Sequence, residues 1–231
     1  MKGKTILVVD DDPNLCHLIE TTFSLAGAKV YTANDGQEGI KAFYDHRPDL
    51  VILDILMPGI DGWEVCRQIR LVSNVPIIML TTLNKDEEII KGLDYGADHF
   101  VTKPFSTQVL LARARAALRR TQLASTPESR TVYQDDYLLI DLPKRQVFVR
   151  GESVRLTATE FDLLSYLFLN AGQVLTYQQI LEQIWGWEYR DSVDYVHVYI
   201  SHLRRKLEED PRNPRYLLTE HGVGYRFQPQ K

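Results

Sequence analysis

The stretch of residues 50–58 constrains the fold of this chain more than any other part of the sequence. It opens with an apolar run over 50–53, which is typical of a strand buried on both faces of a parallel sheet. Asp54 closes that run, and Pro58 and Gly59 then turn the chain. Because ligands of open α/β sheets bind beyond the carboxyl ends of the strands, we expect Asp54 to lie at a binding site.

The first 120 residues alternate predicted strands with predicted helices. The strands are expected over 5–9, 30–33, 50–53, 77–80 and 99–101. A first helix starts at Pro13, is capped by Asp12 and ends at Gly27, with Leu15, Leu18, Ile19 and Phe23 facing inward, and further helices cover 37–45, 62–70, 86–95 and 106–120. This alternation predicts an α/β fold with a doubly wound parallel sheet.

Polar side chains end four of these strands. Asp10 and Asp11 follow the first strand, Asp54 the third, Thr81 the fourth and Lys103 the fifth. Carboxylates crowded at one sheet edge repel by roughly 4 kcal/mol per pair at 4 Å and an effective dielectric near 20, so they need protons or a cation. Oxygen ligands favour Mg²⁺. With a lysine and a hydroxyl beside it, Asp54 is predicted to accept a phosphoryl group.

Each of these residues taken alone has an ordinary structural reading. An acid after a strand is most often a helix cap, as we expect for Asp12. Thr81 alone reads as a strand-end hydroxyl, and Lys103 alone as a solvated charge. The joint placement of all of them at corresponding strand ends favours the functional interpretation.

The first half resembles the receiver domain of a bacterial response regulator over about 120 residues. The resemblance rests on Ile6 to Pro13 at the first strand end, on Asp54 with the segment 57–62, on Thr81, and on Lys103 with Pro104 and Phe105. It implies a five-stranded sheet in the order 2-1-3-4-5, a cis bond before Pro104, and phosphorylation of Asp54 by a cognate histidine kinase. It also implies Mg²⁺ held by Asp10, Asp11, Asp54 and the carbonyl of Leu56.

The resemblance further implies a switch and a dimer contact. Thr81 would move toward the phosphoryl group, and Phe100, where relatives often carry Tyr, would fill the space it leaves. The dimer face would include Ile89, Val109, His99 and Arg113. Relatives usually have a basic residue and an acid at the positions of Ile89 and Val109. In this chain an apolar contact would therefore replace that ion pair.

The second half begins after a predicted linker at 121–131, which is rich in Ser, Thr, Pro and Gln. Short strands are expected over 137–141, 146–150 and 154–156. Thr157 with Glu160, and Thr176 with Gln179, form capping boxes that begin two helices, and Ser192 opens a third helix that runs to about 208. A hairpin over 216–219 and 225–227 closes the half. This order predicts an α+β winged helix-turn-helix domain over 132–231.

The third helix of this half has an apolar stripe and a basic cluster. The stripe consists of Val193, Val196, Ile200, Leu203 and Leu207, and the other positions include Tyr199, Ser201, His202, Arg204, Arg205 and Lys206. Such a helix can enter the major groove and combine base and phosphate contacts. A solvated charged helix end is the alternative, and the hairpin that follows favours DNA binding.

This half resembles the effector domain of OmpR/PhoB-type regulators over about 132–227, mainly through segments 156–164, 200–207 and 222–227. The resemblance implies direct-repeat DNA sites spaced by roughly 10 to 10.5 bp, and a loop over 185–191 that touches RNA polymerase. The expected DNA contacts are Tyr199, Ser201, His202, Arg204, Arg205, Thr219 and His221. Two of them depart from the usual pattern, since relatives commonly have His at Tyr199 and Arg at His221.

Composition limits the remaining possibilities. The formal net charge is −4, shared about equally by the two halves, so any nucleic-acid surface must be a local patch. No apolar run is long enough to span a membrane. Cys16 and Cys66 lack the spacing of metal ligands, and we expect them to be reduced thiols of a cytoplasmic protein.

The resulting prediction is a transcription factor, not an enzyme, whose phosphorylation at Asp54 controls dimerisation and promoter binding. Two alternatives stay open. A Mg²⁺-dependent phosphohydrolase with an aspartate nucleophile would need a second acid at Leu56. A regulator that binds DNA without phosphate would use Ile89 and Val109 to hold a standing dimer.

Overall fold

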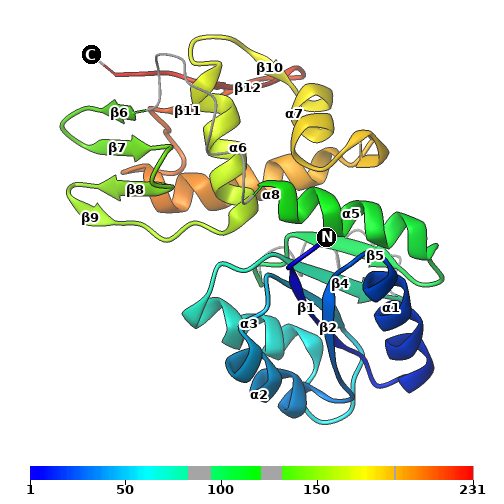
Figure 1. The fold of residues 1–231 in the computed structure, drawn as a ribbon. Helices are drawn as coiled ribbons and strands as arrows, with labels where there is room; N and C mark the ends of the chain where they lie inside the picture. The colour runs from blue at the N-terminus through cyan, green and yellow to red at the C-terminus, as the bar shows by residue number, and fades with distance from the viewer. Residues whose placement is uncertain (83–94, 121–131, 190, 231) are drawn as a thin grey trace. The chain divides into compact units, whose positions relative to one another are not determined.

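The computed structural model describes residues 1–82, 95–120, 132–189 and 191–230 (Figure 1). The chain divides into two compact units, Met1–Thr121 and Gln122–Lys231, called here the N-terminal and C-terminal units. Ile89, most of the helix expected over 86–95 and the whole of the expected linker over 121–131 lie outside the described residues. Within the described part of the chain, no helix combines the length and the apolar character needed to cross a membrane.

The N-terminal unit is built on a five-stranded parallel sheet in the order β2-β1-β3-β4-β5, as predicted. Its strands are β1 (Thr5–Val9), β2 (Lys29–Ala33), β3 (Leu50–Asp54), β4 (Ile77–Thr81) and β5 (His99–Thr102). Every residue of β3 and β4 is buried, because helices cover both faces of the sheet (Figure 1). The acid or hydroxyl that ends each of these two strands therefore reaches the same sheet edge.

Four described helices flank this sheet: α1 (Pro13–Leu25), α2 (Gly36–His46), α3 (Gly62–Val72) and α5 (Thr107–Arg120). Asp12, Asp35 and Asp61 cap the first three, each accepting a hydrogen bond from a backbone N–H in the first turn. These caps start each helix soon after a strand ends.

One inward position was predicted wrongly in α1. Leu18 is 50% exposed, whereas Cys16, Ile19 and Phe23 are buried at helical spacing. Adjacent helix positions are rotated by about 100°, and Leu18 lies on the solvent side of the buried stripe that contains Ile19. Cys16 and Cys66 are both free thiols, and burial raises the pKa of each to about 11.

The C-terminal unit opens with a four-stranded antiparallel sheet, β6 (Val132–Gln134), β7 (Leu138–Asp141), β8 (Gln146–Val149) and β9 (Glu152–Ser153). The strand expected over 154–156 is wrong, because pairing with β8 starts as soon as the chain has turned. Arg150 and Gly151 both have a positive φ, 52° and 83°, and this tight turn pairs Val149 with Glu152. β6 was not predicted.

The winged helix-turn-helix follows as expected, with α6 (Ala158–Leu169), α7 (Tyr177–Ile184), a short 3₁₀ turn η1 (Trp187–Tyr189) and α8 (Val193–Leu207). Both predicted capping boxes are present, at Thr157 with Glu160 and at Thr176 with Gln179. The wing is the antiparallel hairpin of β11 (Leu217–Glu220) and β12 (Gly224–Phe227), and β12 also pairs with the two-residue strand β10 (Leu175–Thr176).

Candidate functional site

Three carboxylates meet at the carboxyl edge of the N-terminal sheet. Oxygen atoms of Asp10, Asp11 and Asp54 all lie within 4.8 Å of one another. Asp10 and Asp54 are buried, while Asp11 is exposed. Because these are hard oxygen donors and one of them faces solvent, the residues fit a Mg²⁺ ion that keeps several waters.

Lys103 joins this cluster from the end of β5. Its Nζ lies 2.7 Å from Oδ2 of Asp10 and 2.9 Å from Oδ1 of Asp54. Burial raises the pKa of Asp54 above its usual value, and the hydrogen bond from Lys103 only partly opposes that effect. Burial by itself would lower the pKa of Lys103, but hydrogen bonds to Asp10 and Asp54 outweigh it and the pKa is raised. The lysine is therefore a stable cation that faces a carboxyl group with a raised pKa.

The backbone around Asp54 is closely packed. A Cβ atom added at Gly62 would lie 2.0 Å from the carbonyl oxygen of Asp54, so only glycine fits at the start of α3. The Gly62 N–H donates to the carbonyl of Ile55 at 3.0 Å, which closes the loop after β3. Leu56, whose carbonyl is the expected fourth ligand, lies in this loop with an exposed side chain.

The expected switch residues lie on neighbouring strands. Thr81 ends β4 and is buried, and Phe100, also buried, pairs with Met79 across β4 and β5. The Phe100 ring centroid is 6.0 Å from that of Trp63 on α3. The peptide bond between Lys103 and Pro104 is cis, as the resemblance implied.

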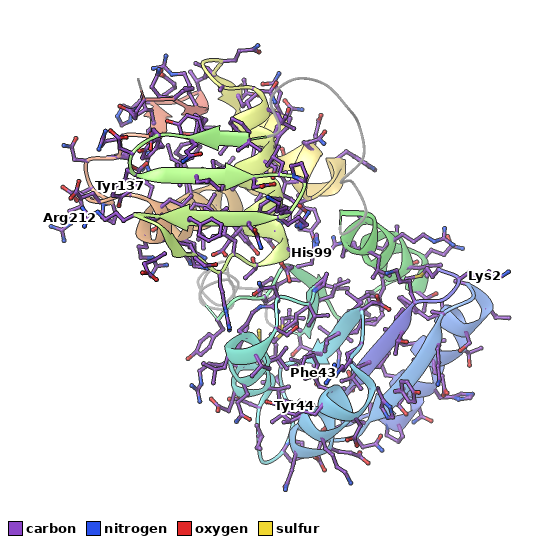
Figure 2. All side chains as sticks on the ribbon, turned by 60° about the vertical axis from the view of Figure 1, so that its left-hand side comes forward. Lys2, Phe43, Tyr44, His99, Tyr137 and Arg212 are labelled. Atoms are coloured by element: carbon purple, nitrogen blue, oxygen red, sulfur yellow. The ribbon has the colours of Figure 1, made fainter. Side chains whose placement is uncertain are left out.

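The residues expected at the dimer contact differ in how exposed they are. Val109 on α5 is 41% exposed, which fits a contact surface. His99, labelled in Figure 2, is fully buried at the start of β5, so its placement argues against the expected surface contact. Arg113 is half-buried and donates from Nη1 to the carbonyl of Phe100, which ties α5 to β5.

In the C-terminal unit, α8 has a wider buried face than its apolar stripe suggested. Tyr199 and His202 are only 2% and 8% exposed, so a direct contact of either side chain with DNA is contradicted by its burial. The ring centroid of Tyr199 lies 5.1 Å from that of Trp185, and His202 Nδ1 lies 3.9 Å from a carboxylate oxygen of Glu160. Both side chains fill the space between α8 and elements that precede it.

The basic residues of α8 differ in their surroundings, because some contact neighbouring elements and others are exposed. Arg204 is half-buried and holds the wing, because its Nε lies 2.9 Å from the Leu217 carbonyl and its Nη2 lies 2.7 Å from Oγ1 of Thr219. Burial lowers the pKa of Arg204. Lys206 donates to Glu160 at 2.6 Å. Ser201 and Arg205 on α8 are exposed, and so is His221 at the wing tip.

One residue of interest was missed by the sequence analysis. His197 is exposed on α8, and its Nδ1 lies 2.8 Å from the hydroxyl of Tyr225 in the wing. The signal was its spacing, since positions 197, 201 and 205 follow one another by four residues and share one helix face. Its partner is distant in sequence, and spacing alone could not identify it.

Comparison with known proteins assigns both units. Residues 6–115 match the family described as "Response regulator receiver domain", and residues 151–227 match "Transcriptional regulatory protein, C terminal". The chain is 46% identical over 230 residues to the "Probable transcriptional regulator ycf27" of Cyanophora paradoxa, with 97% of this chain and 96% of that protein covered. The protein of the same description from Guillardia theta is also 46% identical, with 96% and 90% covered.

Solved structures agree with these matches. DrrB of Thermotoga maritima, described as an OmpR/PhoB homolog, is 34% identical with a TM-score of 0.51, and the match covers 99% of this chain and all of that one. A substituted form of RitR is 27% identical with a TM-score of 0.77 over 99% of this chain and all of that one. The family consists of transcriptional regulators, which agrees with the expectation that the chain is not an enzyme. The chain belongs to the OmpR/PhoB family of response regulators, with a receiver domain followed by a winged-helix DNA-binding domain.

Proposed function

We propose that Asp54 takes a phosphoryl group from a cognate histidine kinase and that this event controls promoter binding by the C-terminal unit. The observation that carries the proposal is the meeting of Asp10, Asp11 and Asp54 with Lys103 at one sheet edge. Such a cluster brings a nucleophilic carboxylate together with positive charge that can stabilise a transferring phosphoryl group.

In the transfer step, a carboxylate oxygen of Asp54 attacks phosphorus, and the bond from phosphorus to the donor nitrogen breaks. The nitrogen keeps the electron pair, and an acyl phosphate forms on Asp54. Asp10, Asp11, Asp54 and the Leu56 carbonyl would hold Mg²⁺, which when bound supplies positive charge next to the phosphoryl oxygens. Lys103, which follows β5 at the same edge of the sheet, supplies a second positive charge.

The response begins with the buried hydroxyl of Thr81 at the end of β4. New phosphoryl oxygens accept a hydrogen bond from this hydroxyl and draw it toward Asp54. Phe100 then fills the vacated space. Because Arg113 donates to the Phe100 carbonyl, movement of β5 is passed to α5, where Val109 offers an apolar contact for a second copy of the chain.

The output is binding of a homodimer to direct repeats in promoter DNA. The exposed side chains of Ser201 and Arg205 on α8 enter the major groove, and His221 approaches the backbone or minor groove from the wing. Arg204 and Thr219 act by holding the wing against α8. The loop around Trp187, whose side chain is exposed, contacts RNA polymerase. We place this activity in the cytoplasm, where the promoter DNA lies.

Labelling tests the first half of this proposal. The full chain is incubated with Mg²⁺ and radiolabelled acetyl phosphate, a small phosphoryl donor, alongside Asp54→Asn and the matched control Asp45→Asn, an exposed acid on α2. We expect acid-stable, base-labile label on the wild type and the control, and loss of that label with Asp54→Asn or with EDTA. Undiminished label on Asp54→Asn would overturn the assignment.

A further inference from the structure

The exposed face of α8 carries a histidine whose ring is held by the wing. Asp194, His197, Ser201 and Arg205 are all exposed and follow one another at spacings of three and four, so they line one face of the helix. His197 is tied to a second element on this face, because its Nδ1 lies 2.8 Å from the hydroxyl of Tyr225.

Aromatic rings from two other elements fix the imidazole in place. Tyr225 lies on β12 and is 5% exposed, so its hydroxyl is a fixed point and not a mobile surface group. The ring of Tyr177, the first residue of α7, meets the His197 ring edge to face at 5.2 Å and the Tyr225 ring at 5.9 Å. A side chain fixed in this way loses little conformational freedom when it binds a partner.

The hydroxyl of Tyr225 also determines where the imidazole carries its proton. Burial raises the pKa of Tyr225, and the nearby charge of Arg204 only partly opposes this, so the hydroxyl keeps its proton at neutral pH. Because a phenol donates more readily than it accepts, we assign the 2.8 Å contact as a hydrogen bond from the Tyr225 hydroxyl to Nδ1. The neutral imidazole then carries its own proton on Nε2, the nitrogen that Tyr225 does not contact.

We propose that His197 reads one base in the major groove by donating from Nε2–H to a purine, with guanine preferred, and that Tyr225 is the positioning residue for this contact. Guanine presents two acceptors in the major groove, N7 and O6, and adenine presents N7. Thymine presents one acceptor, O4, beside its C5 methyl group, and cytosine presents only an amino donor that would meet the Nε2–H. This inference rests on the proposed binding of promoter DNA by α8.

The test compares the wild type with His197→Ala and Tyr225→Phe in the full chain, treated with acetyl phosphate and Mg²⁺. His17→Ala, which removes an exposed histidine on α1, is the matched control. Each protein selects sites from a library of randomised duplex DNA. We expect one position per half-site where the wild type and the control favour guanine by about fivefold, the size of one hydrogen bond, and where His197→Ala shows no preference. Tyr225→Phe keeps the ring and should show a reduced preference at that position alone.

A second measurement changes the DNA and leaves the wild-type protein intact. The selected guanine is replaced with 7-deazaguanine, which lacks the N7 acceptor but keeps the base pair. We expect the affinity of the wild type to fall by about fivefold and that of His197→Ala to stay unchanged.

Three results would overturn the inference. Identical base preferences for the wild type and His197→Ala would show that the imidazole reads nothing. A uniform loss of affinity over all sequences, with a smaller salt dependence, would assign His197 to a phosphate. Failure of the phosphorylated wild type to select any sequence would refute the proposed function as well, and is thereby distinguished from failure of His197 alone.

Discussion

The Nζ of Lys103 lies 2.9 Å from Oδ1 of Asp54, so the cation that ends β5 directly faces the acid that ends β3. The same nitrogen lies 2.7 Å from Asp10. A single lysine thus stabilises two buried carboxylates that would otherwise repel each other. Any change in the charge of Asp54 must therefore alter this contact.

Replacing Lys103 with Met should slow phosphorylation of Asp54. The variant removes the positive charge next to the reacting oxygens, and we expect the initial labelling rate with acetyl phosphate to fall by at least about tenfold. Lys4→Met is the matched control, because Lys4 pairs with Asp49 at 2.8 Å in the same unit but away from the site. Equal labelling rates for the two variants would contradict the role given to Lys103.

Replacing Gly62 with Ala should disturb the backbone at Asp54 through packing alone. The added Cβ would lie 2.0 Å from the Asp54 carbonyl oxygen, and the backbone must move to admit it. We expect a loss of about 1–3 kcal/mol in the free energy of unfolding, measured by urea titration, together with slower labelling. Gly59→Ala is the control, since nothing lies within 4 Å of its Cβ; its φ of +80° allows some loss of stability but labelling should persist.

The C-terminal unit should lose stability in acid through Asp135. Burial acts to raise the pKa of this carboxyl, but hydrogen bonds from the N–H groups of Leu138 and Tyr137 and from the hydroxyls of Tyr133 and Tyr216 outweigh it and hold the pKa below the usual 3.8. A lowered folded-state pKa contributes stability that is present above pH 3.8 and is lost as the pH falls through the folded-state value.

The predicted direction of this pH dependence can be checked by circular dichroism melts of the wild type and Asp135→Asn. The melts are recorded between pH 2.5 and 7 in steps of about half a pH unit. We expect Asp135→Asn to be less stable at pH 7 by about 1–3 kcal/mol, because the amide cannot accept all of these hydrogen bonds. The difference between the two proteins should shrink as the pH falls below 3.8. A difference that stays constant with pH would contradict the assignment.

Two adjacent arginines should respond differently when each is changed to Lys, one through stability and the other through DNA binding. Arg204→Lys loses the two-nitrogen contact with the Leu217 carbonyl and Thr219, so we expect the unfolding free energy to fall by about 1–2 kcal/mol. Arg205→Lys changes an exposed residue and should leave thermal stability unchanged while weakening DNA binding. Equal melting temperatures for the wild type and Arg204→Lys would contradict the wing-holding role.

The parts of the fold that the sequence predicted are those determined by local pattern. The buried strands ending at Asp54 and Thr81 showed as continuous apolar runs, and the capping box at Thr157 showed as spaced residue types. The two-residue strands could not be predicted, because β10 exists only through its pairing with β12, and β9 depends on the left-handed turn at Gly151.

The functional sites, like the fold, were predictable only where a local sequence pattern determined them. The carboxylate cluster was predictable, because the carboxyl ends of parallel strands share one edge. The face of α8 was predicted only in part, because burial of Tyr199 and His202 depends on Trp185 and Glu160, which come from earlier elements. The contact of His197 with the wing is a property of the folded structure and left no mark in the sequence pattern.

The link between Asp54 and DNA binding is tested most directly by measuring the DNA affinity of one preparation before and after phosphorylation of Asp54. Fluorescence anisotropy with a labelled duplex containing the selected direct repeat gives both values at fixed salt, and size-exclusion chromatography of the same samples gives the oligomeric state. We expect phosphorylation to produce a dimer and to tighten binding by about fivefold or more, and we expect neither change with Asp54→Asn. Equal affinities with and without the phosphoryl group would contradict this link and would favour a regulator that binds DNA regardless of phosphate.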